Sequence, residues 1–351
     1  MKKFYTETIG AFHIHSKFSD GTGSLDDIVK CAKKTNLAFI IITDHNSLDI
    51  KEGIFDGVTV IKGEEISKKN ENHYISLNTT EKIISTEPED FIEEVRKKGG
   101  FGFICHPFES KKRKNSSVPI CWQNEEIMPD GVEIWNWFSN FADNYNNNNI
   151  FTNAIGYFLK NKIVKSPQRK TLNFWDKLNS KTKKIIPAIG GVDAHALKVK
   201  KYMLEFCIFP YDVMFKTINN ILYLNEPLGD NFEENKKNIL KAIKEGKNLI
   251  INRNVSENYP EVKVINSLIE ANSGQEILLD NYTYLIVKSP LKQNIINVIK
   301  DGNLIKKTNK NSLTIQVTET GKYRVEIKSG KYGFAYSNPI YVKRGEIDVV
   351  Q

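Results

Sequence analysis

The feature that most constrains the fold is a strand, helix and strand unit at the start of the chain. Residues 9–14 (IGAFHI) have the apolar character of a strand. Ser24 and residues 25–36 follow with a suitable N-cap, early aspartates and late lysines, a pattern typical of a helix. Residues 38–43 (AFIIIT) are a continuous apolar run of the kind buried in parallel sheets. Because a helix separates the two strands, the unit predicts a parallel crossover and an α/β fold.

Similar apolar runs recur as far as residue 196. We expect further strands at residues 58–67, 72–78, 100–106, 130–136 and 185–196, and a helix at 87–98. Residues 139–184 have a polar, helical character, and the asparagine run at 146–149 predicts a loop within them.

After residue 230 the pattern changes. A helix is expected at residues 235–246, and from residue 262 short alternating strands dominate, including a hairpin at Asp301-Gly302. Several short strands at regular spacing predict a small antiparallel β-sandwich. We place the boundary near residue 255, which divides the chain into domains of residues 1–255 and 256–351.

Composition limits the functional classes. The chain has 351 residues, of which 40% are hydrophobic and 26% charged, as in a globular protein without membrane spans. The net charge of +8 favours anionic partners. The four cysteines form no CxxC pair, which favours reduced thiols. No apolar segment follows the first lysines, so we expect no secretory signal and a cytoplasmic location.

The six histidines gather at the ends of the expected strands. They are His13, His15, His45, His73, His106 and His195, and carboxylates such as Asp20 lie near them in the sequence. In an α/β barrel the carboxyl ends of the strands meet on one face, where active sites lie. The sequence therefore predicts one pocket rich in imidazole and carboxylate, ligands that suit Zn²⁺, Mn²⁺ or Fe better than Ca²⁺.

These motifs together resemble those of the PHP (polymerase and histidinol phosphatase) family. In chain order they are HIHSKFSDG, TDHNS, GEEIS, NHYISLN, ICHP and GGVDAHA, and they span residues 9–196. The resemblance implies an α/β fold with a distorted (β/α)7 barrel, which is TIM-like, and a multinuclear metal site. The segments GKYRVEIKSG and AYSNPIYV resemble the C-terminal β-sandwich of a PHP subgroup that includes carbaryl-hydrolase-like proteins.

The resemblance also implies three metal positions. The first would be held by His13, His15, Glu65 and Asp193, the second by Asp20, His45 and His195, and the third by Glu65, His73 and His106. Glu64 competes with Glu65, but neighbouring strand residues face opposite ways, and the family's Gly-x-Glu pattern selects Glu65. Val192 stands where the family more often has serine, which removes a hydroxyl next to the site.

The implied activity is that of a hydrolase that cleaves ester bonds with two or three divalent ions (Zn, Mn or Fe). A metal-bridging hydroxide at the trinuclear site would attack a small phosphorylated substrate. Asp193 could accept a proton, and His195 or His45 could carry one to the leaving group.

Four further residues are candidates for contact with the substrate. Lys17, within the first motif, and Arg113, within the basic tract 111–114, could bind a phosphate. Glu133 and Asn136, towards the end of the expected strand 130–136, resemble a family position that faces the pocket.

Two other functions stay open. The same metal centre could hydrolyse carboxyl or carbamate esters, in which case we expect a more apolar pocket lined by Trp122, Trp135 and Trp137. A nucleic-acid-associated module is less favoured, because the basic residues are dispersed and form no stripe with aromatic residues. We therefore expect a small phosphate ester as the partner, and neither a membrane nor nucleic acid.

Overall fold

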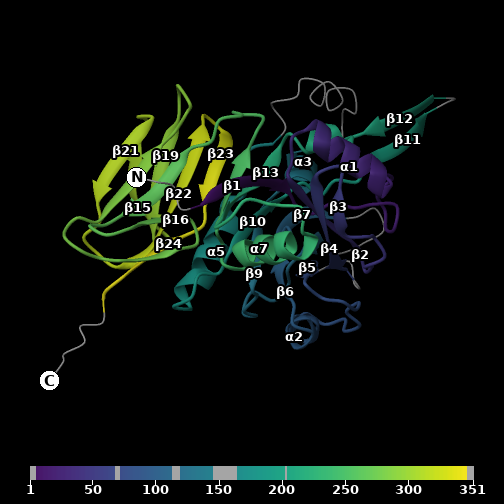
Figure 1. Ribbon diagram of the computed structural model, residues 1–351, viewed down its shortest axis with the longest axis horizontal. Coiled ribbons are helices and arrows are strands. Elements are labelled where there is room, and N and C mark those ends of the chain that lie inside the picture. Colours follow the sequence, from purple (N-terminus) through teal and green to yellow (C-terminus); the bar gives the residue numbers. More distant parts are fainter. Residues whose placement is uncertain (1–4, 68–71, 113–118, 145–163, 202–203, 346–351) are drawn as a thin grey trace.

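The computed structural model describes residues 5–67, 72–112, 119–144, 164–201 and 204–345. A mixed α/β region comes first, and antiparallel β structure follows it. Figure 1 shows the C-terminal strands gathered at one end of the molecule and most of the helices at the other. Within the described residues, no helix combines the length and the apolar character that a membrane span requires.

The α/β region is built on a ladder of strands. In ladder order these are β1 (Thr6–Ala11), β2 (Phe39–His45), β4 (Val58–Ile66), β5 (Tyr74–Leu77), β6 (Phe101–Ile104), β9 (Gly131–Asn136) and β10 (Ala188–Gly191). Neighbours pair in parallel except at β5, which is antiparallel to both β4 and β6. β4 and β5 are too close in sequence for a parallel crossover, which takes a dozen or more residues.

The ladder closes on itself. Beyond the ends of β1 and β10, Ile14 and Ala194 form a parallel bridge. β13 (Ile218–Leu224) runs antiparallel to β1, and the Asn220 side chain bonds both the N–H and the carbonyl of Gly190 in β10, at 3.0 and 2.7 Å. The strands therefore form a closed ring, with the carboxyl ends of β1 and β10 side by side.

The helices cover this ring. They are α1 (Leu25–Lys34), α2 (Pro88–Lys97), α3 (Trp137–Asn144), α5 (Arg169–Ser180), α6 (Tyr211–Met214) and α7 (Phe232–Lys244). α1 begins as expected, because Ser24 and Asp27 form a capping box. Phe39 and Phe103 from the ring pack against Ile239 of α7 in one apolar cluster, and a second cluster joins the outer face of the ring to the other helices.

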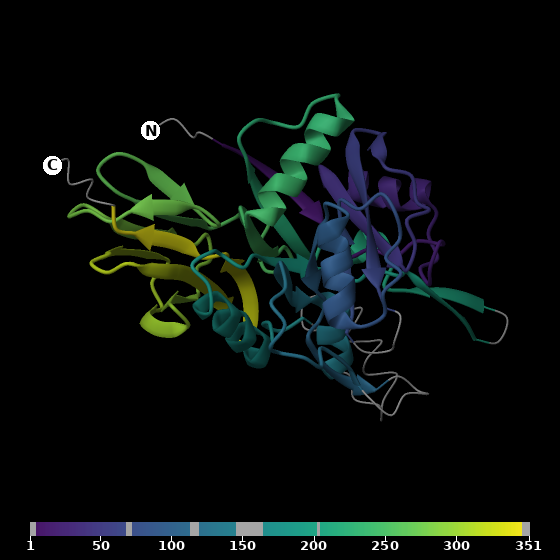
Figure 2. The ribbon, with the colours of Figure 1, turned by 90° about the horizontal axis from the view of Figure 1, so that it is seen from below.

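Short strands complete this region. They are β3 (Gly53–Phe55), β7 (Phe108–Lys112), β8 (Pro119–Cys121), β11 (Leu197–Lys201) and β12 (Leu204–Ile208). β11 and β12 pair as a hairpin that projects on the side away from the C-terminal strands (Figures 1 and 2).

The C-terminal region consists of two sheets with an apolar core. Its strands are β14 (Asn248–Asn252), β15 (Glu261–Ile265), β16 (Glu270–Asn272), β17 (Glu276–Leu278), β18 (Tyr284–Lys288), β19 (Ile295–Lys300), β20 (Asn303–Thr308), β21 (Ser312–Gln316), β22 (Gly321–Ser329), β23 (Tyr332–Ser337) and β24 (Ile340–Lys343). One sheet has the order β16-β15-β18-β21, and the other contains β14-β23-β22-β19-β20. The expected turn at Asp301-Gly302 joins β19 to β20, with φ of 48° and 82° as a two-residue hairpin turn requires.

The two regions share one sheet. β13 pairs with β14, and β14 pairs with β23, so the ladder continues from the ring into the C-terminal strands. Arg324 of β22 also donates to Asp176 of α5 through Nε and Nη2, at 2.7 and 2.6 Å. The domain boundary near residue 255 stays a prediction, and the hydrogen-bonded ladder crosses it.

Candidate metal centre

The ring brings the candidate ligands to one edge. His13 and His15 follow β1, His45 ends β2, Glu65 lies near the end of β4, His106 follows β6, and Asp193 and His195 follow β10. His73 instead precedes β5, and it joins the others because β5 runs in the opposite direction. Side chains far apart in the sequence therefore meet at the carboxyl edge of the parallel strands.

Three of these residues have a backbone conformation that breaks strand alternation. φ is +62° at His13, +26° at His106 and +53° at Asp193. For residues other than glycine such a conformation costs on the order of 1–3 kcal/mol, and it persists where the surroundings enforce it. The concentration of these residues at one edge indicates a functional site.

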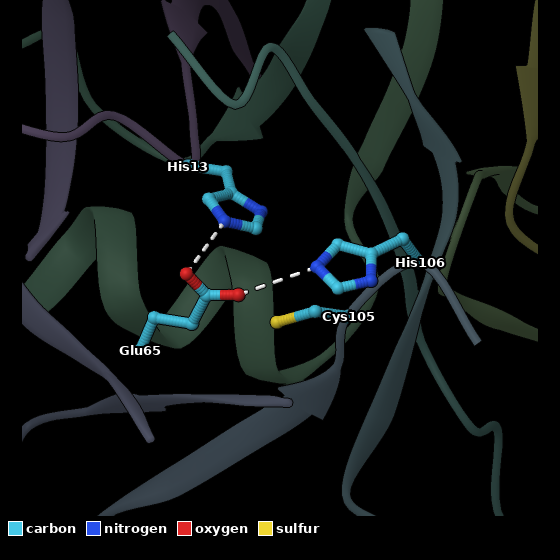
Figure 3. Close-up of side chains that lie close together, drawn as sticks. All are labelled: His13, Glu65, Cys105 and His106. Atoms are coloured by element: carbon cyan, nitrogen blue, oxygen red, sulfur yellow. Dashed lines mark hydrogen bonds and ion pairs between the residues drawn. The ribbon is translucent and has the colours of Figure 1, made fainter. Parts of the chain in front are cut away.

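Glu65 occupies the centre of the cluster. Its Oε1 lies 2.8 Å from His73 Nδ1 and 3.3 Å from His106 Nε2. Its Oε2 lies 3.3 Å from Nε2 of both His13 and His15, and 3.0 Å from His45 Nδ1. Figure 3 shows the carboxylate between His13 and His106. A single buried carboxylate thus contacts imidazoles from five places in the sequence.

Glu64 faces away from this cluster. Its Oε2 accepts the N–H of Ile83 at 3.0 Å, whereas Glu65 faces the histidines. The alternation of side chains along β4 places the two carboxylates on opposite faces of the strand, as we expected.

A second group of donors lies beside the first. His195 Nε2 lies 3.2 Å from Asp20 Oδ1, and His15 Nε2 lies 3.2 Å from Asp193 Oδ1. The rings of His15 and His195 stack with centroids 4.2 Å apart. Four overlapping donor groups have atoms within 4.8 Å of one another: His13 with Glu65, Cys105 and His106; His15 with Asp20, His45 and His195; His13 with His15 and Asp193; and His45 with Glu65 and His73. These groups resemble the three expected sets, with the addition of Cys105.

The burial and charge of the cluster fit divalent cations. His13 Nε2, His15 Nε2, His73 Nε2 and Glu65 Oε2 are buried without a hydrogen-bond partner, which is costly unless a ligand satisfies them. Burial opposes ionisation of Glu65, but the imidazoles, His45 foremost, hold its pKa well below the usual range. Burial, together with nearby His195, lowers the pKa of His15 to about 3. Imidazole nitrogens beside an ionised carboxylate are the donor set that Zn²⁺, Mn²⁺ and Fe accept.

Glu133 and Asn136 lie behind the ligands. Glu133 is 1% exposed and accepts the His13 Nδ1–H at 2.8 Å and the His106 N–H at 2.9 Å. The Asn136 amide donates to Glu133 and to Asp193 at 3.0 and 3.2 Å. These contacts place both residues directly against the candidate ligands, where they can orient them, and their contact with the substrate stays a prediction.

Asp44 secures the loop that carries Asp20. It is fully buried and accepts the N–H and the hydroxyl of Ser16 at 2.7 and 2.6 Å, and the hydroxyl of Ser19 at 2.6 Å. Asp44 was not among the predicted site residues, although it lies within the TDHNS motif next to His45. An aspartate followed by a ligand histidine at a strand end was the available signal.

A cavity of about 230 Å³ opens onto the cluster. It is lined by Asp20, His45, Glu65, His73, His106, Glu109, Phe138, Asp193, His195 and Leu197. Glu109, Phe138 and Leu197 lie outside the expected site, in segments that follow β6, β9 and β10. Glu109 accepts the Ser139 hydroxyl at 2.5 Å, and burial raises its pKa.

Of the two expected phosphate-binding cations, Lys17 does not line this cavity. Lys17 is exposed, and its Nζ lies 5.9 Å from the centroid of the Phe18 ring. Arg113 lies outside the described residues. Among the residues that the structure describes, no lysine or arginine lines the cavity.

The three tryptophans expected in an apolar pocket are core residues. Trp122, Trp135 and Trp137 are 1–4% exposed and belong to the apolar cluster between the ring and the helices. None of them lines the 230 Å³ cavity. The apolar residues that line it are Phe138 and Leu197, beside four acidic residues and four histidines.

The chain is similar to several known proteins. The uncharacterized protein MJ1587 of Methanocaldococcus jannaschii is 29% identical over 187 residues, which cover 46% of this chain and 96% of that protein. A two-domain protein containing a predicted PHP-like metal-dependent phosphoesterase, from Bacteroides vulgatus, is 14% identical with a TM-score of 0.47, and 96% of each chain is covered. PsfC from Pseudomonas syringae is 11% identical with a TM-score of 0.41, over 68% of this chain and 90% of that one.

The family model of the PHP domain matches residues 11–126. This stretch contains every candidate ligand from His13 to His106, whereas Asp193 and His195 follow it in the sequence. Residues 11–126 of this chain thus match the PHP domain.

Proposed function

We propose that this protein is a metal-dependent phosphoesterase that hydrolyses a small phosphorylated molecule. The observation that carries the proposal is the buried Glu65 carboxylate, which contacts five imidazoles at the floor of a cavity. The closed ring of strands supports the finer assignment of a distorted (β/α)7 barrel, and the two C-terminal sheets support that of a β-sandwich.

The proposed ligands are those implied by the sequence motifs. They are His13, His15, Asp20, His45, Glu65, His73, His106, Asp193 and His195, and they would hold two or three divalent ions. Bound ions would supply Lewis acidity and lower the pKa of a coordinated water. His13 Nδ1 is already hydrogen-bonded to Glu133, which leaves the buried Nε2 for an ion. His195 Nδ1 is hydrogen-bonded to the Asp193 carbonyl, and its Nε2 faces Asp20 at 3.2 Å.

The residues that line the cavity have separate roles in the proposal. Asp193 would accept a proton from the attacking water, and His45 or His195 would deliver one to the leaving group. All three line the cavity. The cavity volume limits the substrate to a small molecule or to the phosphate end of a longer one.

The charge of the cavity makes the proposed activity strictly dependent on cations. Asp20, Glu65, Glu109 and Asp193 line the cavity, and no lysine or arginine of the described residues offsets them there. A phosphate dianion would be repelled by the ionised carboxylates, so it binds only when cations neutralise them. Phosphate binding therefore requires prior metal binding.

The test compares two ester substrates. The full-length protein, stripped with a chelator and reloaded with Mn²⁺ or Zn²⁺, is assayed with p-nitrophenyl phosphate and with p-nitrophenyl acetate. We expect metal-dependent release of nitrophenol from the phosphate ester. Turnover of the acetate without turnover of the phosphate would contradict the proposal and favour the carboxyl-ester function. Steeply salt-dependent retention on DNA would favour the nucleic-acid-associated function.

A further inference from the structure

Cys105 lies on the inner face of the ring, directly beside the ligand cluster. Phe101 and Phe103 of β6 belong to the apolar interior, and Cys105 continues the same face two residues further along. His106 reaches the same space because its positive φ breaks the alternation. Two consecutive residues therefore face the cluster, and Figure 3 shows the Cys105 side chain extending towards the carboxylate of Glu65.

The distances place this thiol among metal-binding atoms. One donor atom from each of Cys105, His106, Glu65 and His13 lies within 4.8 Å of the others. In a tetrahedral site with Zn–S of about 2.3 Å and Zn–N of about 2.1 Å, the ligand atoms lie about 3.6 Å apart. Glu65 lies 3.3 Å from both His13 Nε2 and His106 Nε2, and the upper limit of 4.8 Å for the whole group means that a modest movement of side chains would complete a four-ligand site. The thiol has a long contact to the Phe103 carbonyl, at 3.7 Å, and a second one to the Ile75 backbone.

Two neighbouring atoms independently favour a cation at this position. His13 Nε2 and Glu65 Oε2 are both buried without a hydrogen-bond partner and lie 3.3 Å apart. His13 Nδ1 is occupied by Glu133, so only Nε2 can bind an ion. These two donors and the thiol surround the same space below the cavity.

We propose that Cys105 is a metal ligand and that its thiolate completes the most buried position of the centre with Glu65, His106 and His13. This inference rests on the proposed function and extends its ligand set. Three divalent ions carry a charge of +6, and the carboxylates of Asp20, Glu65 and Asp193 supply only −3. A thiolate adds a fourth negative charge at the position furthest from water, and the displaced thiol proton passes to solvent.

The thiolate changes the expected metal preference of this position. Sulfur ligands favour Zn²⁺ and other soft or borderline ions over Mg²⁺ and Mn²⁺. In this arrangement His13 would bind the most buried ion, and His15 and Asp193 would bind the neighbouring ion. A buried cysteine that acts only as a small apolar side chain would confer no such preference.

The test detects the metal–sulfur bond directly. The metal-free full-length protein is titrated with Co²⁺, and the sulfur-to-cobalt charge-transfer band in the near ultraviolet is recorded; X-ray absorption of the zinc-loaded protein then measures the ligand distances. Cys105→Ser and Cys105→Ala are compared with Cys207→Ser, a matched control at an exposed cysteine outside the cluster. We expect the band and a sulfur scatterer at about 2.3 Å in the wild type and in Cys207→Ser, and neither in the Cys105 variants.

The outcomes separate this inference from the proposed function. Stoichiometric metal without a sulfur scatterer in the wild type, or a sulfur signal that survives in Cys105→Ser, would overturn the inference, even if phosphatase activity is present. A sulfur signal that depends on Cys105, in a protein without phosphatase activity, would support the ligand and refute the proposed function. Failure of the wild type to bind metal would overturn both. If the Cys105 variants do not fold, the wild type and Cys207→Ser still decide whether sulfur binds the metal.

Discussion

The substitution Glu65→Gln tests the centre at its most connected residue. Glutamine keeps the shape of the side chain and removes its charge, while the five surrounding imidazoles remain. The carboxylate is 1% exposed and lies 2.8–3.3 Å from the imidazole nitrogens. Removing one partner from such a buried set of charged contacts costs about 3–5 kcal/mol. At about 1.4 kcal/mol per tenfold change, metal binding should weaken about 10²–10⁴-fold.

The assay measures metal affinity by competition with a chromophoric chelator, and metal content by elemental analysis after dialysis. Glu64→Gln is the matched control, because its carboxylate is also buried but accepts the Ile83 N–H instead of facing the histidines. We expect Glu64→Gln to keep the metal affinity of the wild type, although it lowers the free energy of unfolding. A Glu65→Gln protein that binds metal as tightly as the wild type would refute the reasoning, as would loss of metal in Glu64→Gln alone.

Four further predictions follow from the same contacts. The double substitution His13→Ala with His15→Ala should remove metal and activity together, and full metal stoichiometry in that variant would contradict the site. Glu133→Gln should weaken metal binding about 10–100-fold while the protein still folds, as for other residues that orient a ligand histidine; unchanged affinity would argue against this role. In the metal-free protein, burial opposes the charge of His106, but the nearby carboxylates raise its pKa to about 9 from the ordinary 6.5. The stability that this shift contributes is complete below pH 6.5 and is lost as the pH rises through 9, so the Tm of metal-free protein should fall across this range, and a constant Tm would contradict the assignment. Deletion of residues 258–351 would leave β14 without its partner β23, so we expect an aggregated, inactive protein, whereas a soluble and active one would make the C-terminal strands accessory.

The predictable part of the site depends on simple periodicity. Alternation along a strand is enough to separate Glu64 from Glu65. The convergence of strand ends in an α/β fold is enough to bring ligands from distant segments together. These rules use only the order of residues along the chain.

Other parts depend on tertiary structure that the sequence pattern does not show. The conformation with positive φ at His106 directs its imidazole to the same space as Cys105, which no alternation rule predicts. His73 joins the site because β5 runs backwards between β4 and β6. Glu133 and Asn136 face the site as expected, but their depth behind the ligands follows from the packing of the closed ring.

The walls of the cavity were the least predictable. Glu109 and Leu197 come from segments that follow the strands, where no motif distinguishes a pocket residue from a surface residue. The sequence pattern also does not predict that the C-terminal strands extend the sheet that contains β13. This extension depends on pairing between β14 and β23, which joins segments about eighty residues apart.

The central claim is that the buried cluster around Glu65 binds divalent metal ions. The most direct measurement is anomalous X-ray scattering from crystals of the protein loaded with Zn²⁺ or Mn²⁺, recorded on both sides of the metal absorption edge. We predict anomalous peaks among Glu65, the surrounding imidazoles and Asp193, within bonding distance of those side chains. Fully loaded crystals with no anomalous peak in this cluster, or with peaks only at surface residues, would contradict the account.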